Sequence, residues 1–203
     1  MKTRHELYLE IHNKMSEKNG LTPKALWGSE YSQIKRFEVF SKILNHEEEN
    51  VDILDFGSGL GHLYEYLINK NFKINYTGLE INKNFYDISA RKYQDARFIL
   101  GDINSLDRKQ EFDYVFASGI YNLGSIFEMQ NAFKSDFDIL FSNTKRACVI
   151  NFLSKNSPNQ DNISVYHDCK EIIRIIEDNF SKKYDLYHNY LPNDFTIVIW
   201  REY

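Results

Sequence analysis

The stretch that decides the fold is VDILDFGSGLGHL, residues 51–63. A mostly apolar run ends at Asp55, and glycines then occupy every second position, at Gly57, Gly59 and Gly61. The chain has only nine glycines in 203 residues, and one would suffice for a turn from a strand into a helix. Glycine lacks a Cβ, so a ligand can approach its main chain closely. We therefore interpret the stretch as a strand, a ligand-binding loop and the start of a helix.

Strands alternate with helices on the C-terminal side of this loop. The patterns predict strands over residues 51–56, 74–80, 97–100, 113–118 and 146–152, and helices over 62–69, 84–93, 127–141 and 169–180. This alternation is typical of a parallel sheet with helices on both faces. Residues 184–202 contain two strands joined by Pro192, Asn193 and Asp194, a connection too short for a helix. We therefore expect an antiparallel hairpin, with a reversed strand at the end of the sheet.

The segment before residue 51 has helical periodicity. Leu7, Ile11 and Met15 recur four apart, which predicts one face of a helix over residues 3–18. Ser29 suits the N-cap of a second helix, whose apolar residues keep helical spacing at Tyr31, Ile34, Phe37, Phe40, Ile43 and Leu44. A length of 203 residues suits one domain. We divide that domain, 1–203, into an N-terminal helical lid (1–48) and an α/β core (49–203).

Composition narrows the classes of partner. The formal net charge is -4, and the basic residues occur in isolated pairs, whereas nucleic-acid binding needs clustered Lys and Arg. No apolar run reaches the roughly 20 residues of a membrane helix. The N-terminus does not resemble a signal peptide, and Cys148 and Cys169 are too few for a disulfide framework. We expect a cytoplasmic protein with reduced thiols that binds neither nucleic acid nor membrane, and the oligomeric state stays open.

The spacing of the glycines favours one kind of nucleotide. A dinucleotide site has G-x-G-x-x-G, whereas this loop has G-x-G-x-G after Asp55. This spacing suits a nucleoside that carries an amino acid, with loop carbonyls and Asp55 holding the ammonium group. Glu80 ends the second predicted strand, where a carboxylate can accept the ribose hydroxyls. Asp102, or the backbone of Ile103, follows the third strand and could meet the adenine amino group.

On these residues the chain resembles the class I S-adenosylmethionine-dependent methyltransferases. The markers are DFGSGLG, the acid in GLEIN, GDI, the strand FDYVFASGIYN and the terminal hairpin HNYLPNDFTIVIW. The resemblance implies a Rossmann-like seven-stranded sheet, mostly parallel with one antiparallel strand from the C-terminal hairpin. It also implies S-adenosylmethionine as the cofactor and S-adenosylhomocysteine as its product. The expected cofactor-binding residues are Asp55, Gly57, Ser58, Gly59, Gly61, His62, Glu80, Ile81, Asp102, Ile103, Ser118, Gly119 and Arg36.

The acceptor wall should follow the fourth strand, along Ser118-Gly119-Ile120-Tyr121-Asn122. Metal-dependent small-molecule methyltransferases place an Asp at the end of this strand, whereas Asp113 lies at its start, so we predict no catalytic metal. The candidate substrate-binding residues are Tyr8, Trp27, Gln33, Asn122 and Tyr190, and the candidate catalytic residues are His12, His188 and Tyr121. His188 and Tyr190 should share one strand face, because they are two residues apart.

The sequence leaves several functions open. The leading one is transfer of a methyl group to a small-molecule acceptor, on oxygen. A sugar or sugar-phosphate derivative is the first expectation and a small carboxylic acid the second. The stretch WGSEYSQIKRFEVF looks like the lead-in helix of a small bacterial subgroup, some members of which accompany genes for surface polysaccharides. The alternatives are an NAD(P)-dependent oxidoreductase on a related fold and a non-catalytic protein that binds an adenosyl ligand.

Overall fold

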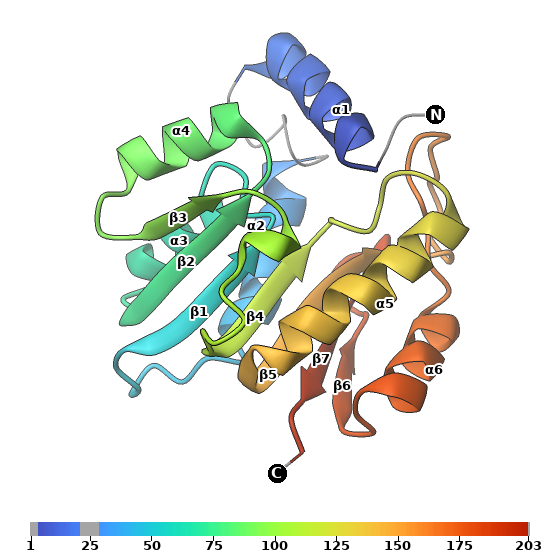
Figure 1. The fold of residues 1–203 in the computed structure, drawn as a ribbon. Helices are drawn as coiled ribbons and strands as arrows, with labels where there is room; N and C mark the ends of the chain where they lie inside the picture. Colours follow the sequence, from blue (N-terminus) through green and yellow to red (C-terminus); the bar gives the residue numbers. More distant parts are fainter. Residues whose placement is uncertain (1–3, 21–28, 203) are drawn as a thin grey trace.

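The computed structural model describes residues 4–20 and 29–202, and its seven strands form one sheet (Figure 1). The strands are β1 (Val51–Phe56), β2 (Ile74–Glu80), β3 (Arg97–Leu100), β4 (Phe112–Ser118), β5 (Thr144–Leu153), β6 (Tyr184–Tyr187) and β7 (Asp194–Trp200). The helices are α1 (Arg4–Asn19), α2 (Glu30–Ser41), α3 (His62–Asn69), α4 (Lys83–Lys92), α5 (Ile126–Ser142) and α6 (Cys169–Asn179). Every helix and strand expected from the sequence is present, with bounds that shift by a few residues.

The strand order confirms the expected sheet and corrects one detail. The order is β3-β2-β1-β4-β5-β7-β6, in which β7 runs antiparallel to both of its neighbours. The reversed strand is therefore inside the sheet, and the edge strand β6 runs parallel to β1–β5. The register pairs Leu153 with Asp194 and Asn151 with Thr196. As a result, the first residues of β7 lie beside the last residues of β5, at the carboxyl ends of the parallel strands.

The connection between β6 and β7 is longer than the sequence suggested. Strand β6 ends at Tyr187 and β7 begins at Asp194, so residues 188–193 form the connection. The expectation that His188 and Tyr190 share a strand face is therefore wrong. His188 is exposed in this connection, whereas the Tyr190 hydroxyl group reaches back to the sheet, where it contacts Asn151 and Thr196.

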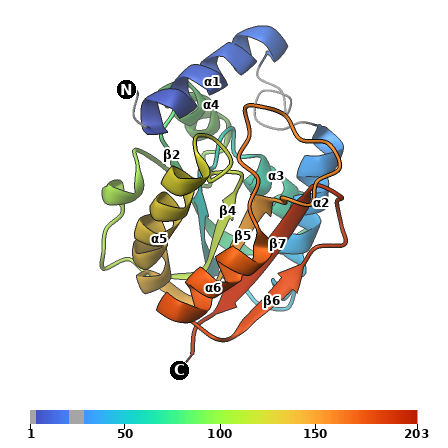
Figure 2. The same ribbon diagram turned by 90° about the vertical axis from the view of Figure 1, so that its right-hand side faces the viewer.

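Helices cover both faces of the sheet (Figure 2). Helices α2 and α3 pack on one face through a cluster that includes Phe37, Phe40 and Leu67, and α5 and α6 pack on the other through Phe133, Phe137 and Ile172. Helix α1 lies across the carboxyl-end edge of the sheet (Figure 1). None of the helices in the described ranges is long and apolar enough to cross a lipid bilayer.

Helix α2 starts as predicted, and Phe37 and Phe40 are buried as expected, but its first turns present a different face to the interior. The Ser29 side chain accepts a hydrogen bond from the Ser32 N–H, which confirms the N-cap. Tyr31 and Ile34, expected on the apolar face, are 64% and 37% exposed, whereas Gln33 and Arg36 are buried. The helix therefore directs two polar side chains into the molecule. Such burial is favourable only where these groups find partners, and both do so at the site described next.

Candidate active site

A cavity of about 520 Å³ lies at the carboxyl ends of β1, β2 and β4. Its wall also includes residues of α1, α2, the start of β7 and the loop between β5 and α6, residues 154–168. Strand β1 lies between β2 and β4, so the sheet order reverses at this point. Open α/β sheets bind ligands at such reversal points, and the volume lies within the range of small-molecule and cofactor sites.

The glycine loop forms one end of the cavity with main chain. Gly57 and Gly59 line it with φ angles of 80° and 56°, a left-handed region that favours glycine. The N–H groups of Gly57 and Ser58 donate to the Leu79 carbonyl at 2.8 and 3.1 Å, which fixes the loop on β2. Gly61 is different because it does not line the cavity. A Cβ there would come within 2.8 Å of the Tyr93 ring, so this glycine serves helix packing.

Glu80 holds the glycine loop from the neighbouring strand. Its two carboxylate oxygens accept the N–H groups of Gly59 and Asn82, each at 2.7 Å. The residue is only 4% exposed, yet it lines the cavity. Burial raises the pKa of this carboxyl group, and the backbone hydrogen bonds partly oppose that shift. The carboxylate oxygens keep lone pairs for a ligand, because each can accept two hydrogen bonds.

Asp55 lies beside Glu80 and has the more perturbed pKa. Burial, with a smaller contribution from the charge of Glu80, raises this pKa from 3.8 to about 7, although the Tyr76 hydroxyl donates to its carboxylate at 2.5 Å. Asp55 is therefore close to half-protonated at neutral pH. A cation bound nearby would favour the charged carboxylate.

The third predicted acid, Asp102, also lines the cavity. Asp102 lines the wall and accepts a hydrogen bond from the Asn104 N–H, which caps a short 3₁₀ turn over Ile103–Ser105. Ile103 itself packs in the core and does not line the cavity. The structure thus brings Asp55, Glu80 and Asp102 to one cavity, as the strand-end positions predicted, but not Ile103.

Helix α1 covers the cavity with an aromatic and an imidazole side chain. The Tyr8 hydroxyl donates to the Gly119 carbonyl at 3.3 Å, and the Tyr8 and His12 rings meet edge to face at 5.5 Å. Burial lowers the pKa of His12 to about 4, so its imidazole is neutral at pH 7. The Asn82 amide also donates to Asn13 at 3.1 Å. Helix α1 is therefore attached to the loops after β2 and β4.

Helix α2 supplies the two buried polar side chains noted above. Gln33 lies 3.1 Å from Nδ1 of His62, the first residue of α3, and both residues line the cavity. Burial lowers the pKa of His62, which favours the neutral ring. Arg36 forms a buried ion pair with Asp194 through its Nε. This pair joins α2 to the start of β7.

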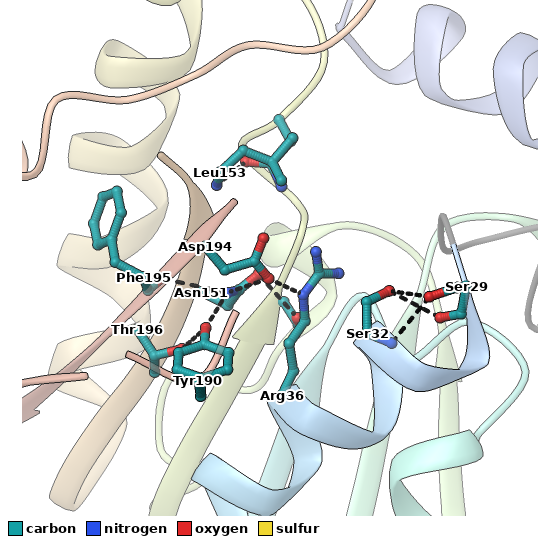
Figure 3. A network of polar contacts seen from close by, with 11 residues as sticks. Ser29, Ser32, Arg36, Asn151, Leu153, Tyr190, Asp194, Phe195 and Thr196 are labelled. Carbon is teal, nitrogen blue, oxygen red and sulfur yellow. Dashed lines mark hydrogen bonds and ion pairs between the residues drawn. The ribbon is translucent and has the colours of Figure 1, made fainter. Parts of the chain in front are cut away.

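Asp194 is the centre of a polar network (Figure 3). The Asn151 amide donates to the Tyr190 hydroxyl at 2.8 Å and contacts Asp194 Oδ2 at 3.4 Å, and Tyr190 also contacts Thr196 Oγ1 at 2.7 Å. Sequence reasoning missed both Asp194 and Asn151. A signal was available for Asn151, since it is a lone amide in the apolar strand ACVINFL. Asp194 gave no comparable signal, because acids are common in turns before a strand.

The loop over residues 154–168 closes the remaining side of the cavity. Its wall residues are Asn159, Asp161, Ile163, Ser164 and Tyr166, none of which was predicted. The loop is anchored where the His167 ring contacts the Tyr121 carbonyl at 2.7 Å. Asn122 anchors the same loop, because its carbonyl oxygen accepts a hydrogen bond from the Val165 N–H at 2.8 Å.

Several predicted residues take other places in the structure. Tyr121 is fully buried among Phe133 and Phe152, so it forms core and not the acceptor wall. His188 is exposed and is not part of the cavity wall, so its predicted role as a base has no geometric support. Tyr190 lies behind Asp194 and outside the wall. Trp27 falls outside the described residues. The wall does include Ser58, Ile81, Ser118, Gly119 and Asn122.

The cavity fits S-adenosylmethionine by charge and by shape. The cofactor carries a sulfonium and an ammonium group, and the wall holds the carboxyl groups of Asp55, Glu80 and Asp102. Gly59 presents main chain to the cavity, whereas a Cβ on Gly57 would come within 2.9 Å of the Ile120 side chain. Arg36 and Asp194 line the same cavity and provide polar groups in addition to those that fit the cofactor. The arrangement can therefore hold a donor and an acceptor together.

Comparisons with known proteins agree with this geometry. The methyltransferase domain family matches residues 53–143. The chain is 31% identical over 156 residues to Rv1506c of Mycobacterium tuberculosis, whose name describes a candidate methyltransferase, covering 72% of this chain and 91% of that protein.

Two solved structures show the same fold at low sequence identity. One is magnesium protoporphyrin IX methyltransferase from Synechocystis PCC 6803 with bound S-adenosylmethionine, which has a TM-score of 0.67 at 13% identity. The alignment covers 100% of this chain and 99% of the other. The plantazolicin methyltransferase BpumL, in complex with a substrate analogue and S-adenosylhomocysteine, has a TM-score of 0.66 at 12% identity over 95% and 90% of the two chains. The chain thus belongs to the methyltransferase domain family and is a class I methyltransferase whose cofactor is S-adenosylmethionine.

Proposed function

We propose that this enzyme methylates a hydroxyl oxygen of a small polar molecule, a sugar or sugar derivative being the class we favour. The observation that carries the proposal is the two-ended cavity. One end has the glycine loop and three acids, and the other has the Arg36–Asp194 pair beneath the amide and hydroxyl groups of the 154–168 loop. Amides, carboxylates and hydroxyls are the groups that match the hydroxyls of a sugar. A role in surface polysaccharide synthesis is part of this proposal.

The cofactor end would hold S-adenosylmethionine through the residues that line it. We assign the ribose hydroxyls to Glu80, the ammonium group to Asp55 with the carbonyls of the glycine loop, and the adenine to the neighbourhood of Asp102 and Ile81. His62, Ser118 and Gly119 complete this wall. Arg36, which the sequence assigned to the cofactor, pairs through its Nε with Asp194 at the start of β7, so we place it at the acceptor end.

The bound cofactor supplies a methyl group that is already activated for attack by a nucleophile. The protein then has to align the acceptor and exclude water. Helix α1 and the 154–168 loop cover the cavity from two sides and serve that purpose. His12 is the candidate base, because its neutral ring lines the cavity, although the lowered pKa makes it a weaker base than an ordinary histidine.

Calorimetric titration with S-adenosylhomocysteine and, separately, with NADH tests the cofactor assignment. We expect binding of the first ligand only. Release of S-adenosylhomocysteine during incubation with neutral glycosides, sugar phosphates and small carboxylic acids then tests the reaction. A His12→Gln variant should bind S-adenosylhomocysteine normally and lose about 100-fold or more in turnover. Cofactor binding without turnover of any acceptor in the panel would favour the non-catalytic alternative instead.

A further inference from the structure

We propose that the Arg36–Asp194 pair is the acceptor subsite and that it selects an uncharged acceptor with two neighbouring hydroxyl groups, as in a neutral sugar. This inference rests on the proposed function, because it names the substrate class of the same cavity. It also decides against two of the acceptor classes that the sequence left open, the sugar phosphates and the small carboxylic acids.

The first step of the argument is the way in which Asp194 meets the cavity. Its side chain is 1% exposed and that of Arg36 is 9% exposed, yet both residues line the wall. Oδ2 of Asp194 contacts Arg36 Nε and the Asn151 amide. Within residues 4–20 and 29–202, Oδ1 has no hydrogen bond, and Figure 3 shows it directed away from those two partners. Because Asp194 lines the cavity, Oδ1 can accept a hydrogen bond from a ligand there.

The second step is the rigidity of the pair. Asn151 is fully buried on β5 and connects Asp194 to Tyr190, and Ser118 at the end of β4 contacts the Asn151 side-chain oxygen at 3.4 Å. A ligand group at Oδ1 would therefore meet a carboxylate whose position is fixed by two strands. Preorganised groups of this kind cost little reorganisation on binding.

The third step is the balance of charge. Asp194 is neutralised by Arg36, and the rest of the described wall contains no lysine and several acids, among them Asp161 on the 154–168 loop. In the complex with S-adenosylhomocysteine, which has no sulfonium, an anionic acceptor would therefore lie near carboxylates without a spare cation from the protein. A cationic acceptor would lie beside both the guanidinium group and the sulfonium of the cofactor. An uncharged acceptor avoids both kinds of repulsion.

The last step is the match between the pair and vicinal hydroxyls. A guanidinium group has five N–H donors, so Arg36 can donate to a ligand in addition to Asp194. Asp194 Oδ1 can accept a hydrogen bond from one hydroxyl while Arg36 donates to its neighbour. The cavity wall also includes Asn159, Ser164 and Asn193, whose uncharged side chains suit the remaining hydroxyls of such a ligand.

The test uses protein saturated with S-adenosylhomocysteine and four probes: methyl β-D-glucopyranoside, glucose 6-phosphate, glucuronate and glucosamine. Saturation-transfer NMR titrations give the affinity for each probe. We expect the neutral glycoside to bind at least about tenfold tighter than either anion or the amine. Tighter binding of a charged probe, or no binding of the neutral glycoside, would overturn the inference.

Two variants test whether the Arg36–Asp194 pair binds the acceptor or serves only as a structural ion pair. Asp194→Asn leaves Arg36 unneutralised, so binding of the neutral glycoside should fall about tenfold while glucose 6-phosphate and glucuronate gain affinity. If Asp194→Asn fails to fold, the charge-conserving double variant Arg36→Gln/Asp194→Asn should lose the glycoside without gaining the anions. Asp138→Asn, an exposed carboxylate on α5, is the matched control and should behave as wild type. Unchanged glycoside binding in the folded Asp194 variant would contradict the proposal.

The affinity for S-adenosylhomocysteine, measured on the same samples, distinguishes a failure of the proposed function from a failure of the acceptor inference. If wild-type protein does not bind this ligand, the proposed function fails. If it binds the ligand but prefers charged probes, only the acceptor inference fails.

Discussion

The two ends of the cavity are built in different ways. The end that we assign to the cofactor consists of one local segment, residues 55–62, and acids at the tips of the next two strands. The end that we assign to the acceptor depends on Arg36, Asn151 and Asp194, which come from α2, β5 and β7 and meet only in the folded sheet. The first end is specified by main-chain conformation, and the second by side-chain pairing between distant elements. Mutations should therefore disturb the two ends differently.

The largest expected effect is at the acceptor end. Arg36→Met would leave Asp194 buried and charged without its partner, which should lower the free energy of unfolding by about 3–5 kcal/mol. Replacing both residues, Arg36→Met with Asp194→Leu, should restore most of that loss, because no uncompensated charge remains. Urea unfolding of the three proteins checks this. Equal stability of the single and double variants would show that the pair is not electrostatically coupled.

At the cofactor end, removal of the Asp55 carboxylate should raise the free energy of unfolding, whereas the loss of Arg36 should lower it. The pKa of Asp55 is about 7 in the folded protein against an ordinary 3.8, so the folded state holds the proton more tightly. The resulting stability is present below pH 3.8 and is lost as the pH rises through 7. Asp55→Asn should therefore stabilise the protein at pH 8 by up to about 4 kcal/mol and flatten this pH dependence.

The same variant should weaken cofactor binding. S-adenosylmethionine is cationic, so wild-type affinity should increase from pH 6 to pH 8 as Asp55 ionises. Asp55→Asn should bind more weakly at pH 8 and show little change with pH. Thermal unfolding and calorimetry on one set of samples measure both effects. A variant that is stabilised and also binds normally would remove Asp55 from the cofactor site.

A side chain in the glycine loop should affect binding more than stability. Gly59→Val places a branched side chain at φ 56°, on the cavity wall, and should weaken S-adenosylhomocysteine binding about 100-fold, or 2.7 kcal/mol. Gly20→Val is the matched control, because Gly20 has φ 66° but nothing within 4 Å of a Cβ. It carries the backbone strain without blocking the cavity, so its affinity should be that of wild type. Equal losses in the two variants would mean that strain alone is responsible.

The smallest expected effect is on the cover over the cavity. Tyr8→Phe removes the hydroxyl that donates to the Gly119 carbonyl at 3.3 Å and keeps the ring against His12. The loss of one partly exposed hydrogen bond should weaken S-adenosylhomocysteine binding by about two- to fivefold. Stopped-flow measurement should find that change in the dissociation rate. An unchanged dissociation rate would indicate that α1 does not retain the cofactor.

The same contrast explains what the sequence could predict. Strand and helix positions, the glycine loop and Glu80 follow from local patterns of period and spacing, and the structure contains them. The inner face of α2 was predicted only in part: Phe37 and Phe40 are buried, whereas Tyr31 and Ile34 have the apolar character of core residues and yet are exposed. The inner face of this helix also holds Gln33 and Arg36, whose burial depends on partners far along the chain. The position predicted for Tyr121 on the acceptor wall was wrong for a related reason, because its place after β4 did not show that its ring is buried in the core.

A crystal structure with S-adenosylhomocysteine bound tests the central claim most directly. We predict that its ribose lies within hydrogen-bond distance of Glu80, with its sulfur directed toward the end of the cavity that holds Arg36 and Asp194. An adenosyl group bound away from Gly59 and Glu80, or a sulfur atom directed away from the Arg36–Asp194 pair, would contradict the two-ended cavity.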